Sequence, residues 1–441
     1  MIRRIQALNY RCLRYVDVHL DGSFHILVGA NASGKSTLLD VIGFLADLVV
    51  DDLDTAVARR TRNFQDLVWG RKGTNAGFEL AVEFEIPEEL RAKLLYKESE
   101  DIAFRFFQYE VAVQSGDDGL CIASEGGFLK NNYGMRLEQR DFDKGLGLAV
   151  TSSRVFPSTK PAPDSILTGT DAWDYRCTFQ KSADGKDTFT PEVTTGLGVL
   201  GRSQLRFTFG KRRSALGNLP EDPELFPVST YAKRILVEGV QKLFLDSTRL
   251  RRASSPNNRR LGFDSDGSNL PWAIQWLRES DPGKFTEWLG HIQTALRDVV
   301  DIRIVEREDD RHAYLMLRHT TGVEVPSWTV SDGTLRLLAL TLTAYLPDNE
   351  KIYLMEEPEN GIHPMAIETV YQSLSSIYES QVLVATHSPV FLGCAAPEEV
   401  LCFAKNEGGA TDIIRGSQHP RLADWQSSAD INLLFATEVL G

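Results

Sequence analysis

The sequence carries a glycine-rich segment whose residue types and spacing suit the binding of a phosphate chain. It reads GANASGKS from Gly29 to Ser36 and follows the apolar run Phe24–Val28. Glycines allow a turn in which successive backbone N–H groups point inward at a phosphate. The Lys35 ammonium would contact the terminal phosphates, and the Ser36 hydroxyl would ligate Mg²⁺. The motif therefore assigns nucleotide contacts to Gly29, Asn31, Ala32, Ser33, Gly34, Lys35, Ser36 and Thr37.

Two carboxylates follow a second apolar run late in the chain. Ile352–Met355 leads directly into Glu356, Glu357 and Pro358. In an open parallel sheet the carboxyl end of such a strand lies beside the phosphate-binding turn. Glu356 would hold Mg²⁺ or one of its water ligands, and Glu357 would orient and deprotonate an attacking water. An acidic strand end is common on its own, so this hypothesis depends on its pairing with the phosphate loop.

Two shorter motifs complete the set of candidate site residues. His387 follows the apolar run Val382–Ala385, where a sheet would place it near the last phosphate and where a structural histidine is the alternative. The segment SDGT, from Ser331 to Thr334, opens a helical stretch. Its serine suits a helix N-cap and an anion site at the helix N-terminus about equally well.

In this order the four motifs resemble the ABC-type ATPase heads of RecF, SMC and OLD-like proteins. The stretches Glu356–Pro364 and Asp266–Pro271 are similar to stand-alone prokaryotic AAA-family ATPases of the OLD-like group, which occur in phage-defence operons. The opening Asn9–Leu13 matches the start of that group. The resemblance covers roughly residues 1–110 and 235–400.

The resemblance implies an α/β P-loop NTPase with a mostly parallel core sheet, an antiparallel β subdomain and a middle insertion. It also implies that two heads dimerise around ATP and Mg²⁺, with Ser331 and Gly333 reaching the nucleotide of the second subunit. Arg11 is expected near the nucleotide, and Gln65 is the candidate for the glutamine that ligates Mg²⁺ in this family. The implied catalytic residues are Glu357, His387 and Lys35, and the implied metal ligands are Ser36, Glu356 and Gln65.

The sequence departs from the family pattern at two motifs. Glu356 stands where the family usually has Asp, and its longer arm shifts the Mg²⁺ contact or inserts a water. The signature reads SDGT instead of SGGQ. Asp332 would repel a phosphate unless its side chain turns away.

The elements that must position these motifs alternate between strands and helices in the first and last thirds of the chain. Periodicity predicts, in chain order, paired strands in 2–20, a strand over 24–28, a helix over 36–49, alternating strands over 77–86 and 104–113 with a bulge near Phe106 and Phe107, a helix over 231–244, two helices in 270–300, a hairpin over 302–319, a helix over 334–346, and a strand, helix and strand over 352–385. The last unit has the length of a parallel crossover.

These elements divide the chain into five parts. They are an N-terminal head part (1–115), a β-rich insertion (116–230), a helical subdomain (231–300), a C-terminal head part (301–400) and an extension (401–441). Within the insertion, the strand-like pieces 175–179 and 205–209 predict a small β platform, and Arg206 and Lys211–Arg213 give it a cationic surface. We expect this platform to bind a partner or nucleic acid.

Composition and charge exclude several classes of protein. Hydrophobic residues make up 42% and charged residues 25%, as in globular domains. No apolar run reaches the roughly 18 residues of a membrane helix, no signal sequence is visible, and the five cysteines lack metal-ligand spacing, so we expect a reduced, cytoplasmic protein with no membrane partner. The net charge of −13 opposes coating of nucleic acid by bulk charge, although basic clusters such as Arg249–Arg252 keep DNA as a candidate partner.

Taken together, these features predict an ATPase that dimerises and acts as sensor or regulator of a separately encoded effector, a nuclease or toxin, in prokaryotic anti-phage defence. Only 54 residues follow His387, too few for the nuclease domain that OLD-like proteins carry, and this predicts a separate effector chain. The alternative is a RecF-like ATPase of DNA repair or maintenance. The roughly 300 residues between Lys35 and Ser331 oppose a transporter ATPase, and the complete motif set opposes a pseudo-ATPase scaffold.

Overall fold

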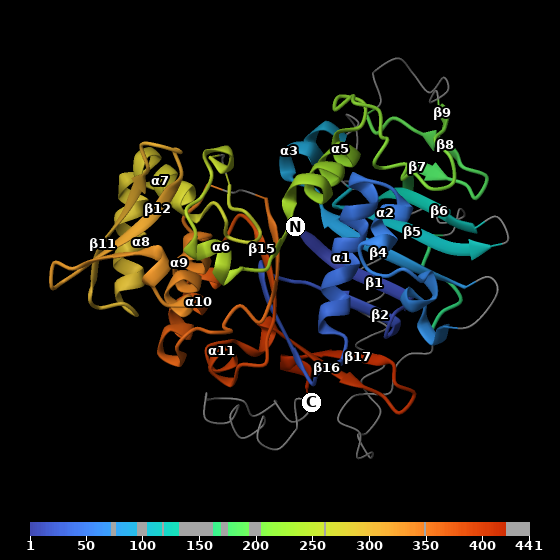
Figure 1. The fold of residues 1–441 in the computed structure, drawn as a ribbon. Coiled ribbons are helices and arrows are strands. Elements are labelled where there is room, and N and C mark those ends of the chain that lie inside the picture. The colour runs from blue at the N-terminus through green and yellow to red at the C-terminus, as the bar shows by residue number, and fades with distance from the viewer. Residues whose placement is uncertain are drawn as a thin grey trace. The chain divides into compact units, whose positions relative to one another are not determined.

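The computed structural model describes residues 1–71, 76–94, 104–116, 119–131, 162–168, 175–193, 204–259, 262–347 and 350–419. The chain divides into two compact units, whose course Figure 1 traces. The first contains Met1–Asp21, Asn31–Val240 and Phe403–Ile414, and the second contains Gly22–Ala30, Gln241–Cys402 and Arg415–Gly441. Much of the expected insertion, and residues 420–441 of the expected extension, lie outside the described residues.

The first unit is built on an eight-stranded antiparallel sheet in the order β2-β1-β4-β5-β6-β7-β8-β9. Four of these strands come from the segment expected to be an insertion, and they extend the sheet that β1 begins. The strands are β1 Ile2–Tyr10, β2 Leu13–His19, β4 Gly77–Glu85, β5 Phe106–Gly116, β6 Gly119–Lys130, β7 Tyr175–Lys181, β8 Lys186–Phe189 and β9 Leu205–Thr208. The five domain boundaries themselves remain a prediction.

Strand β4 shows the expected alternation, and its polar face is covered at Glu83, whereas Glu79 and Glu85 are half-buried. Glu83 is only 3% exposed and accepts a hydrogen bond of 2.7 Å from the Lys130 ammonium on β6. A cross-sheet ion pair thus lets this one carboxylate lie on a covered surface. The expected bulge near Phe106 is also misplaced: β4 and β5 pair in unbroken register, and the irregularity lies at Ala112 and Val113, against β6.

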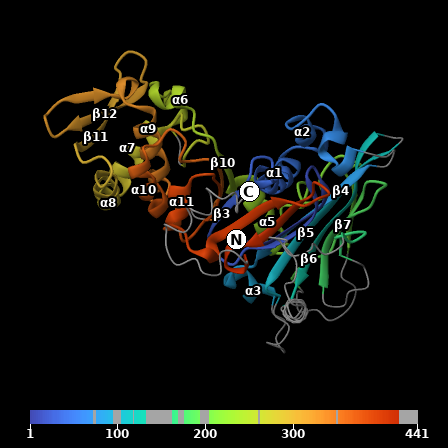
Figure 2. The same cartoon turned by 90° about the horizontal axis from the view of Figure 1, so that it is seen from below.

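Helix α1, Lys35–Val50, packs against this sheet through aromatic rings (Figure 2). The Phe44 ring lies 5.3 Å from that of Phe78 on β4, and the Phe78 ring lies 4.9 Å from that of Tyr10 on β1. Edge contacts of this kind add to the apolar area that the rings bury. They fix the position of α1, and with it the position of the loop that precedes this helix.

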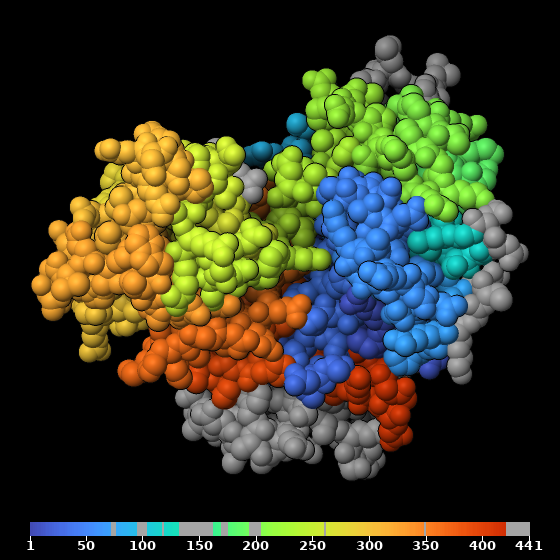
Figure 3. Space-filling view, in the orientation of Figure 1, coloured from blue at the N-terminus to red at the C-terminus, as the bar shows by residue number. Residues whose placement is uncertain are grey.

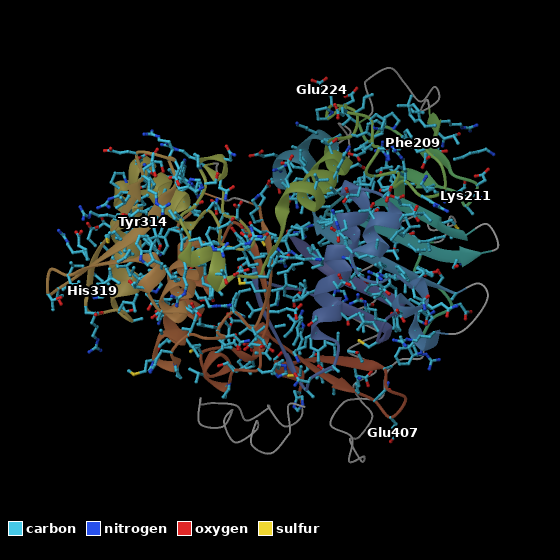
Figure 4. All side chains as sticks on the ribbon, viewed as in Figure 1. Phe209, Lys211, Glu224, Tyr314, His319 and Glu407 are labelled. Atoms are coloured by element: carbon cyan, nitrogen blue, oxygen red, sulfur yellow. The ribbon has the colours of Figure 1, made fainter. Side chains whose placement is uncertain are left out.

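The cationic cluster expected on the β platform is partly engaged in packing within the first unit. Lys211, labelled in Figure 4, is exposed together with Arg212 and Arg213. The Arg212 guanidinium lies 2.8 Å from the Asp54 carboxylate, and the Arg212 carbonyl accepts a hydrogen bond of 3.0 Å from the Leu53 N–H. The segment therefore ties the end of the sheet to helix α2, Leu53–Ala58.

The second unit holds parallel strands. Strands β10, β14, β15 and β3 are neighbours in that order, and β16 follows β3. Helix α10 connects β14 to the parallel strand β15, so the expected crossover is confirmed. The bounds are β3 Phe24–Gly29, β10 Val240–Leu243, β14 Ile352–Glu356, α10 Pro364–Ser375, β15 Gln381–Ala385 and β16 Val400–Lys405.

The helix expected over 231–244 is replaced by three shorter elements. Helix α5, Pro227–Arg234, leads into a π-helical turn, Ile235–Gly239, and the chain then enters strand β10. Glycine is a poor helix former, and the β-branched Val240 begins a strand at the edge of the sheet. Sheet pairing thus overrides the helical periodicity after Gly239.

The second unit also holds the two helices expected in 270–300, the expected hairpin and the helix expected over 334–346, whereas α6, β13 and α11 were not predicted. Helices α7 and α8 flank Asp281, whose carboxylate caps α8 by accepting a hydrogen bond of 2.9 Å from the Lys284 N–H. The buried Trp288 ring donates to the Thr341 hydroxyl at 3.0 Å and so joins α8 to α9. The bounds are α6 Ser247–Arg251, α7 Leu270–Ser280, α8 Pro282–Gln293, β11 Val299–Glu306, β12 Ala313–His319, β13 Glu324–Pro326, α9 Asp332–Leu342 and α11 Pro389–Gly393.

Two further elements complete the described part of the chain. They are α3, Glu88–Leu94, in the first unit, and β17, Thr411–Arg415, which forms a hairpin with the end of β16. Among the helices described, none combines the length and apolar character that a bilayer crossing requires.

Candidate functional site

The glycine-rich segment forms a loop between the end of β3 and the start of α1. The backbone is left-handed at Ala32 and at Gly34, with φ of 62° and 113°. Alternation of right- and left-handed residues makes neighbouring N–H groups converge on a concave surface that suits an anion. Gly34 is the residue before the first turn of α1, so the helix N-terminus opens at the end of the loop.

The strand hairpin at residues 400–415 holds this loop from behind, and sequence analysis missed this contact. The Thr411 hydroxyl donates a hydrogen bond of 2.7 Å to the Ser33 carbonyl, and the Thr411 N–H donates one of 3.1 Å to the Cys12 carbonyl. Thr411 is 1% exposed. A Cβ atom at Gly34 would lie 2.4 Å from the Thr411 hydroxyl, so the contact itself requires glycine at this position.

The first turn of α1 presents the side chains expected to contact phosphate and metal. Lys35 is 7% exposed, whereas Ser36 points to the surface and Thr37 is half-buried. The Cys12 thiol lies 3.3 Å from the Thr37 hydroxyl, which places the β1–β2 turn beside this first helical turn. An exposed serine hydroxyl after a buried lysine is an arrangement that can take a phosphate-bound Mg²⁺.

Arg11 occupies the same β1–β2 turn and faces α1. Its guanidinium lies 3.3 Å from the Asp40 carboxylate, which also accepts hydrogen bonds of 2.7 Å from the Tyr10 hydroxyl and 2.8 Å from the Arg60 guanidinium. Asp40 thus gathers three donors on the second turn of α1. Burial, with the negative charge of Asp40, raises the pKa of Tyr10, so its hydroxyl stays protonated as a donor.

Gln65 lies on a short 3-10 helix, Phe64–Leu67, and is exposed. The segment reaches the same turn, because the Arg11 N–H donates a hydrogen bond of 2.9 Å to the Leu67 carbonyl. The structure therefore brings the Gln65 segment beside Arg11. Its role as a Mg²⁺ ligand remains a prediction.

In the second unit, the strand ends and the entry to the phosphate loop share one edge of the parallel sheet. Glu356 pairs with Ala385 on β15, and Ala385 pairs with Leu27 on β3. Gly29 is two residues beyond Leu27, so the loop begins at the edge where the carboxylates follow β14. Glu356 is exposed there, and its carboxylate is a hard oxygen ligand of the kind that Mg²⁺ prefers.

Glu357 is fixed by its backbone and by a neighbouring amide. Its φ is 45°, an uncommon conformation for a residue with a side chain. The Glu357 N–H donates a hydrogen bond of 2.7 Å to the Ala385 carbonyl, and the Asn360 amide donates to the Glu357 carboxylate. Strained residues of this kind persist where the surrounding contacts over-determine them, and they gather at functional sites.

A third glutamate, Glu359, which the sequence motifs did not single out, links this turn to the histidine loop. The Glu359 side chain is 8% exposed and accepts a hydrogen bond from the Thr386 hydroxyl. Burial raises the pKa of Glu359, and the negative charge of Glu357 raises it further. The hydrogen bonds from the Thr386 hydroxyl and the His387 N–H lower this pKa. The backbone N–H of His387 therefore contacts the same carboxylate that the Thr386 hydroxyl contacts.

The signature segment lies at the N-terminus of α9. The Ser331 hydroxyl accepts a hydrogen bond of 3.2 Å from the Thr334 N–H and caps the helix, while Ser331 remains exposed. Gly333 packs against the next loop so closely that a Cβ there would lie 2.3 Å from the Gly361 carbonyl. The Asp332 carboxylate accepts a hydrogen bond of 2.6 Å from the Arg251 guanidinium, so the negative charge that would repel a phosphate is paired.

The site residues expected from the sequence thus fall into two groups. Arg11, Gln65 and the loop residues from Asn31 to Thr37 belong to the first unit. The second unit holds Gly29, Ser331, Gly333, Glu356, Glu357 and His387. Thr411, Glu359 and Arg251 are additions from the structure, and each acts on a sequence-expected residue through a contact distant in the chain.

Removal of the Thr411 hydroxyl should loosen the phosphate loop. Because Thr411→Val keeps the side-chain volume but loses the bond to Ser33, worth about 1 kcal/mol, we expect nucleotide affinity to fall about fivefold. Calorimetric titration with a non-hydrolysable ATP analogue measures the change. Thr178→Val is the matched control, since that buried hydroxyl donates to the Gly127 carbonyl at 3.1 Å, away from the loop. Equal nucleotide affinity of the Thr411→Val and Thr178→Val proteins would contradict a role of the Thr411–Ser33 hydrogen bond, which we call the Thr411 clamp.

Two protein-family models match the chain. One, described as "AAA ATPase domain", matches residues 1–143 and includes the phosphate loop. The other, described as "AAA domain, putative AbiEii toxin, Type IV TA system", matches residues 218–393 and includes the signature, carboxylate and histidine motifs. The sequence matches no curated protein.

Heads of SMC proteins are among the similar solved structures. An SMC head bound to the C-terminal winged-helix domain of ScpA has a TM-score of 0.50 at 14% identity, over 94% of this chain and 97% of that chain. The Smc head with an extended coiled coil bound to the C-terminal domain of ScpA, from Pyrococcus furiosus, has a TM-score of 0.46 at 12% identity, over 94% and 95%. The SMC head from Thermotoga maritima has a TM-score of 0.42 at 11% identity, over 94% of this chain and 98% of that chain.

The first of these similarities shows the fold, and the two family models match ATPase-type domains over residues 1–143 and 218–393. The expected α/β fold of ABC-ATPase head type is confirmed, with its large antiparallel sheet and its separate sheet of parallel strands. The chain carries AAA-family ATPase domains in an SMC-head fold, as its resemblance to the RecF, SMC and OLD-like ATPases implies.

Proposed function

We propose that the chain binds ATP with Mg²⁺, hydrolyses the γ-phosphate bond, and uses the cycle to regulate a separately encoded effector. The observation that carries the proposal is the shared sheet edge, where the carboxylates after β14 and the histidine loop after β15 lie beside the strand that leads into the phosphate loop. Ligands of open α/β sheets bind at such carboxyl edges.

Each residue has a distinct role in the proposed reaction. Lys35 and the loop N–H groups hold the β- and γ-phosphates, and the Ser36 hydroxyl with Glu356 supplies hard oxygen ligands for Mg²⁺. The ion, when bound, offsets the charge that develops on the phosphate oxygens. Glu357, aimed by Asn360, accepts the proton of the attacking water, and His387 lies toward the γ-phosphate.

Dimerisation around nucleotide is part of the proposal. The exposed Ser331 and the N-terminus of α9 offer an anion-binding end that a second copy can use. The head dimer is the form in which the signature of one copy completes the site of the other. Arg11 contributes on the phosphate-loop side of that site.

The effector is proposed to be a nuclease or toxin in prokaryotic anti-phage defence. The description of the family model that matches residues 218–393 contains the words toxin and TA system, and this supports a place for the chain in a system of this kind. In this proposal ATP hydrolysis sets the state of the head, and the head restrains or releases the effector.

Substitutions at the two central residues should separate binding from turnover. Lys35→Ala removes a charge-assisted phosphate contact and should weaken ATP binding about tenfold or more. Glu357→Gln keeps the shape but cannot act as base, so binding should persist while turnover falls at least about 100-fold. Phosphate release and nucleotide titration measure the two effects. Glu379→Gln, an exposed carboxylate before β15, is the control; parental turnover in Glu357→Gln would refute the role of Glu357.

Mixing two inactive chains tests the composite site. A Ser331→Arg chain keeps its phosphate loop, and a Lys35→Ala chain keeps its signature, so a heterodimer has one intact site. We expect hydrolysis to rise above either variant alone, toward about half of the parent rate for each heterodimer and about a quarter for a randomly mixed sample. If heterodimers form and hydrolysis does not recover, the site is completed within one chain.

The defence role is tested in cells that carry the gene with its native neighbours. Phage plating should be suppressed by the parent gene and restored by Lys35→Ala, because a head that cannot bind nucleotide cannot switch its effector. The Glu379→Gln gene serves as the control and should protect like the parent. Equal suppression by the Lys35→Ala gene would argue against an ATP-driven defence function.

A further inference from the structure

A cationic pocket opens beside the signature segment, within the second unit. It has a volume of about 430 Å³ and lies between α6, the loop that follows α6, the β11–β12 hairpin and the start of α9. These elements lie side by side in Figures 1 and 2, and their yellow-green and orange surfaces adjoin in Figure 3. The lining that matters is Ser247, Arg251, Arg252, Arg307, Trp328 and Asp332.

The charges of this pocket favour an anionic ligand. Three arginines and one aspartate line it, a formal balance of +2, and the Arg307 guanidinium also lies 3.4 Å from the Asp310 carboxylate outside the lining. The Arg307 guanidinium is placed over the Tyr314 ring, 6.0 Å from its centre, and Figure 4 labels Tyr314 on β12. Trp328 is 47% exposed, and its ring lies 4.8 Å from that of Tyr314. Guanidinium groups of this kind bind phosphate through paired N–H donors.

Asp332 and Arg251 form an ion pair at the mouth of the pocket. The Arg251 Nε donates to the Asp332 carboxylate at 2.6 Å, and its Nη1 donates to the Trp328 carbonyl at 3.1 Å. Both side chains are partly exposed, 34% for Arg251 and 49% for Asp332. The pair is therefore accessible to a competing anion, and its strength in water is modest.

The carboxylate occupies a position that would otherwise attract phosphate. Asp332 is the first residue of α9, where the helix N-terminus favours negative charge. It stands between Ser331 and Gly333, the two residues that contact the phosphate of a second copy in the proposed function. The charge of Asp332 repels an incoming phosphate, and the nearby Arg251 guanidinium offsets this repulsion.

We propose that the Asp332 carboxylate is an internal stand-in for phosphate, and that the pocket takes the phosphate tail of a nucleotide held by a second copy of the chain. Arg251 then exchanges its bond to Asp332 for one to the phosphate, with Arg252 and Arg307 beside it. A polyphosphate outcompetes one carboxylate because it carries more charge and more acceptor oxygens. This inference rests on the proposed function, since it takes the ligand to come from the second copy.

Tripolyphosphate is the probe that tests the pocket when binding at the phosphate loop is weakened. Titrations use the full chain with Lys35→Ala as the common background. Asp332→Asn removes the competing charge and keeps the side-chain shape, so affinity should rise about tenfold; Arg251→Ala should lower it about tenfold. Arg249→Ala is the control, because its guanidinium pairs with Asp266 at 3.0 Å outside the pocket. Circular dichroism melts establish that each variant is folded.

The outcomes separate this inference from the function on which it rests. Equal tripolyphosphate affinity in the background, Asp332→Asn and Arg251→Ala proteins would overturn the exchange. A second measurement adds Arg251→Ala to the Lys35→Ala chain and mixes it with the Ser331→Arg chain. Recovery of hydrolysis that is undiminished by Arg251→Ala refutes the role of Arg251 and leaves the composite site standing. The expected affinities together with no recovery in any mixture would show that Arg251 and Asp332 control anion binding in the pocket, and would overturn a second copy as the source of the phosphate.

Discussion

Parallel pairing of β14, β15 and β3 is the constraint on which the candidate site depends. Because the three strands run the same way, their carboxyl ends reach one edge in register, Glu356 opposite Ala385 and Ala385 opposite Leu27. Each strand then releases a loop that carries chemistry. The order of these loops along the edge is set by backbone hydrogen bonds between the strands, which do not depend on the side chains of the loops.

The parts of the site that sequence could predict are those with local rules. A phosphate loop needs glycines at fixed spacing, and a capped helix needs a residue like Ser331 at its start. Thr411 and Arg251 escaped prediction because each acts on a residue far away in the chain, 378 and 81 positions respectively. No pattern within a short window records such a contact.

The fold shows the same division between local and distant information. Periodicity located most helices and strands, but the helix expected over 231–244 gave way at Gly239 because β10 joins a sheet. Strand β4 alternates as predicted, yet Glu83 on its charged face is buried and paired with Lys130 from another strand. In both cases a partner elsewhere in the chain overrides the local pattern.

The Thr411 clamp has a consequence for how the protein comes into being on the ribosome. The phosphate loop leaves the exit tunnel early, whereas Thr411 is made 378 residues after Ser33. A nascent chain that already displays the complete loop sequence lacks the hydroxyl that holds it and the wall that shapes the turn at Gly34. The loop acquires its final form only after β17 has been synthesised. A chain that ends before β17 therefore carries the phosphate-loop motif without the Thr411 contact.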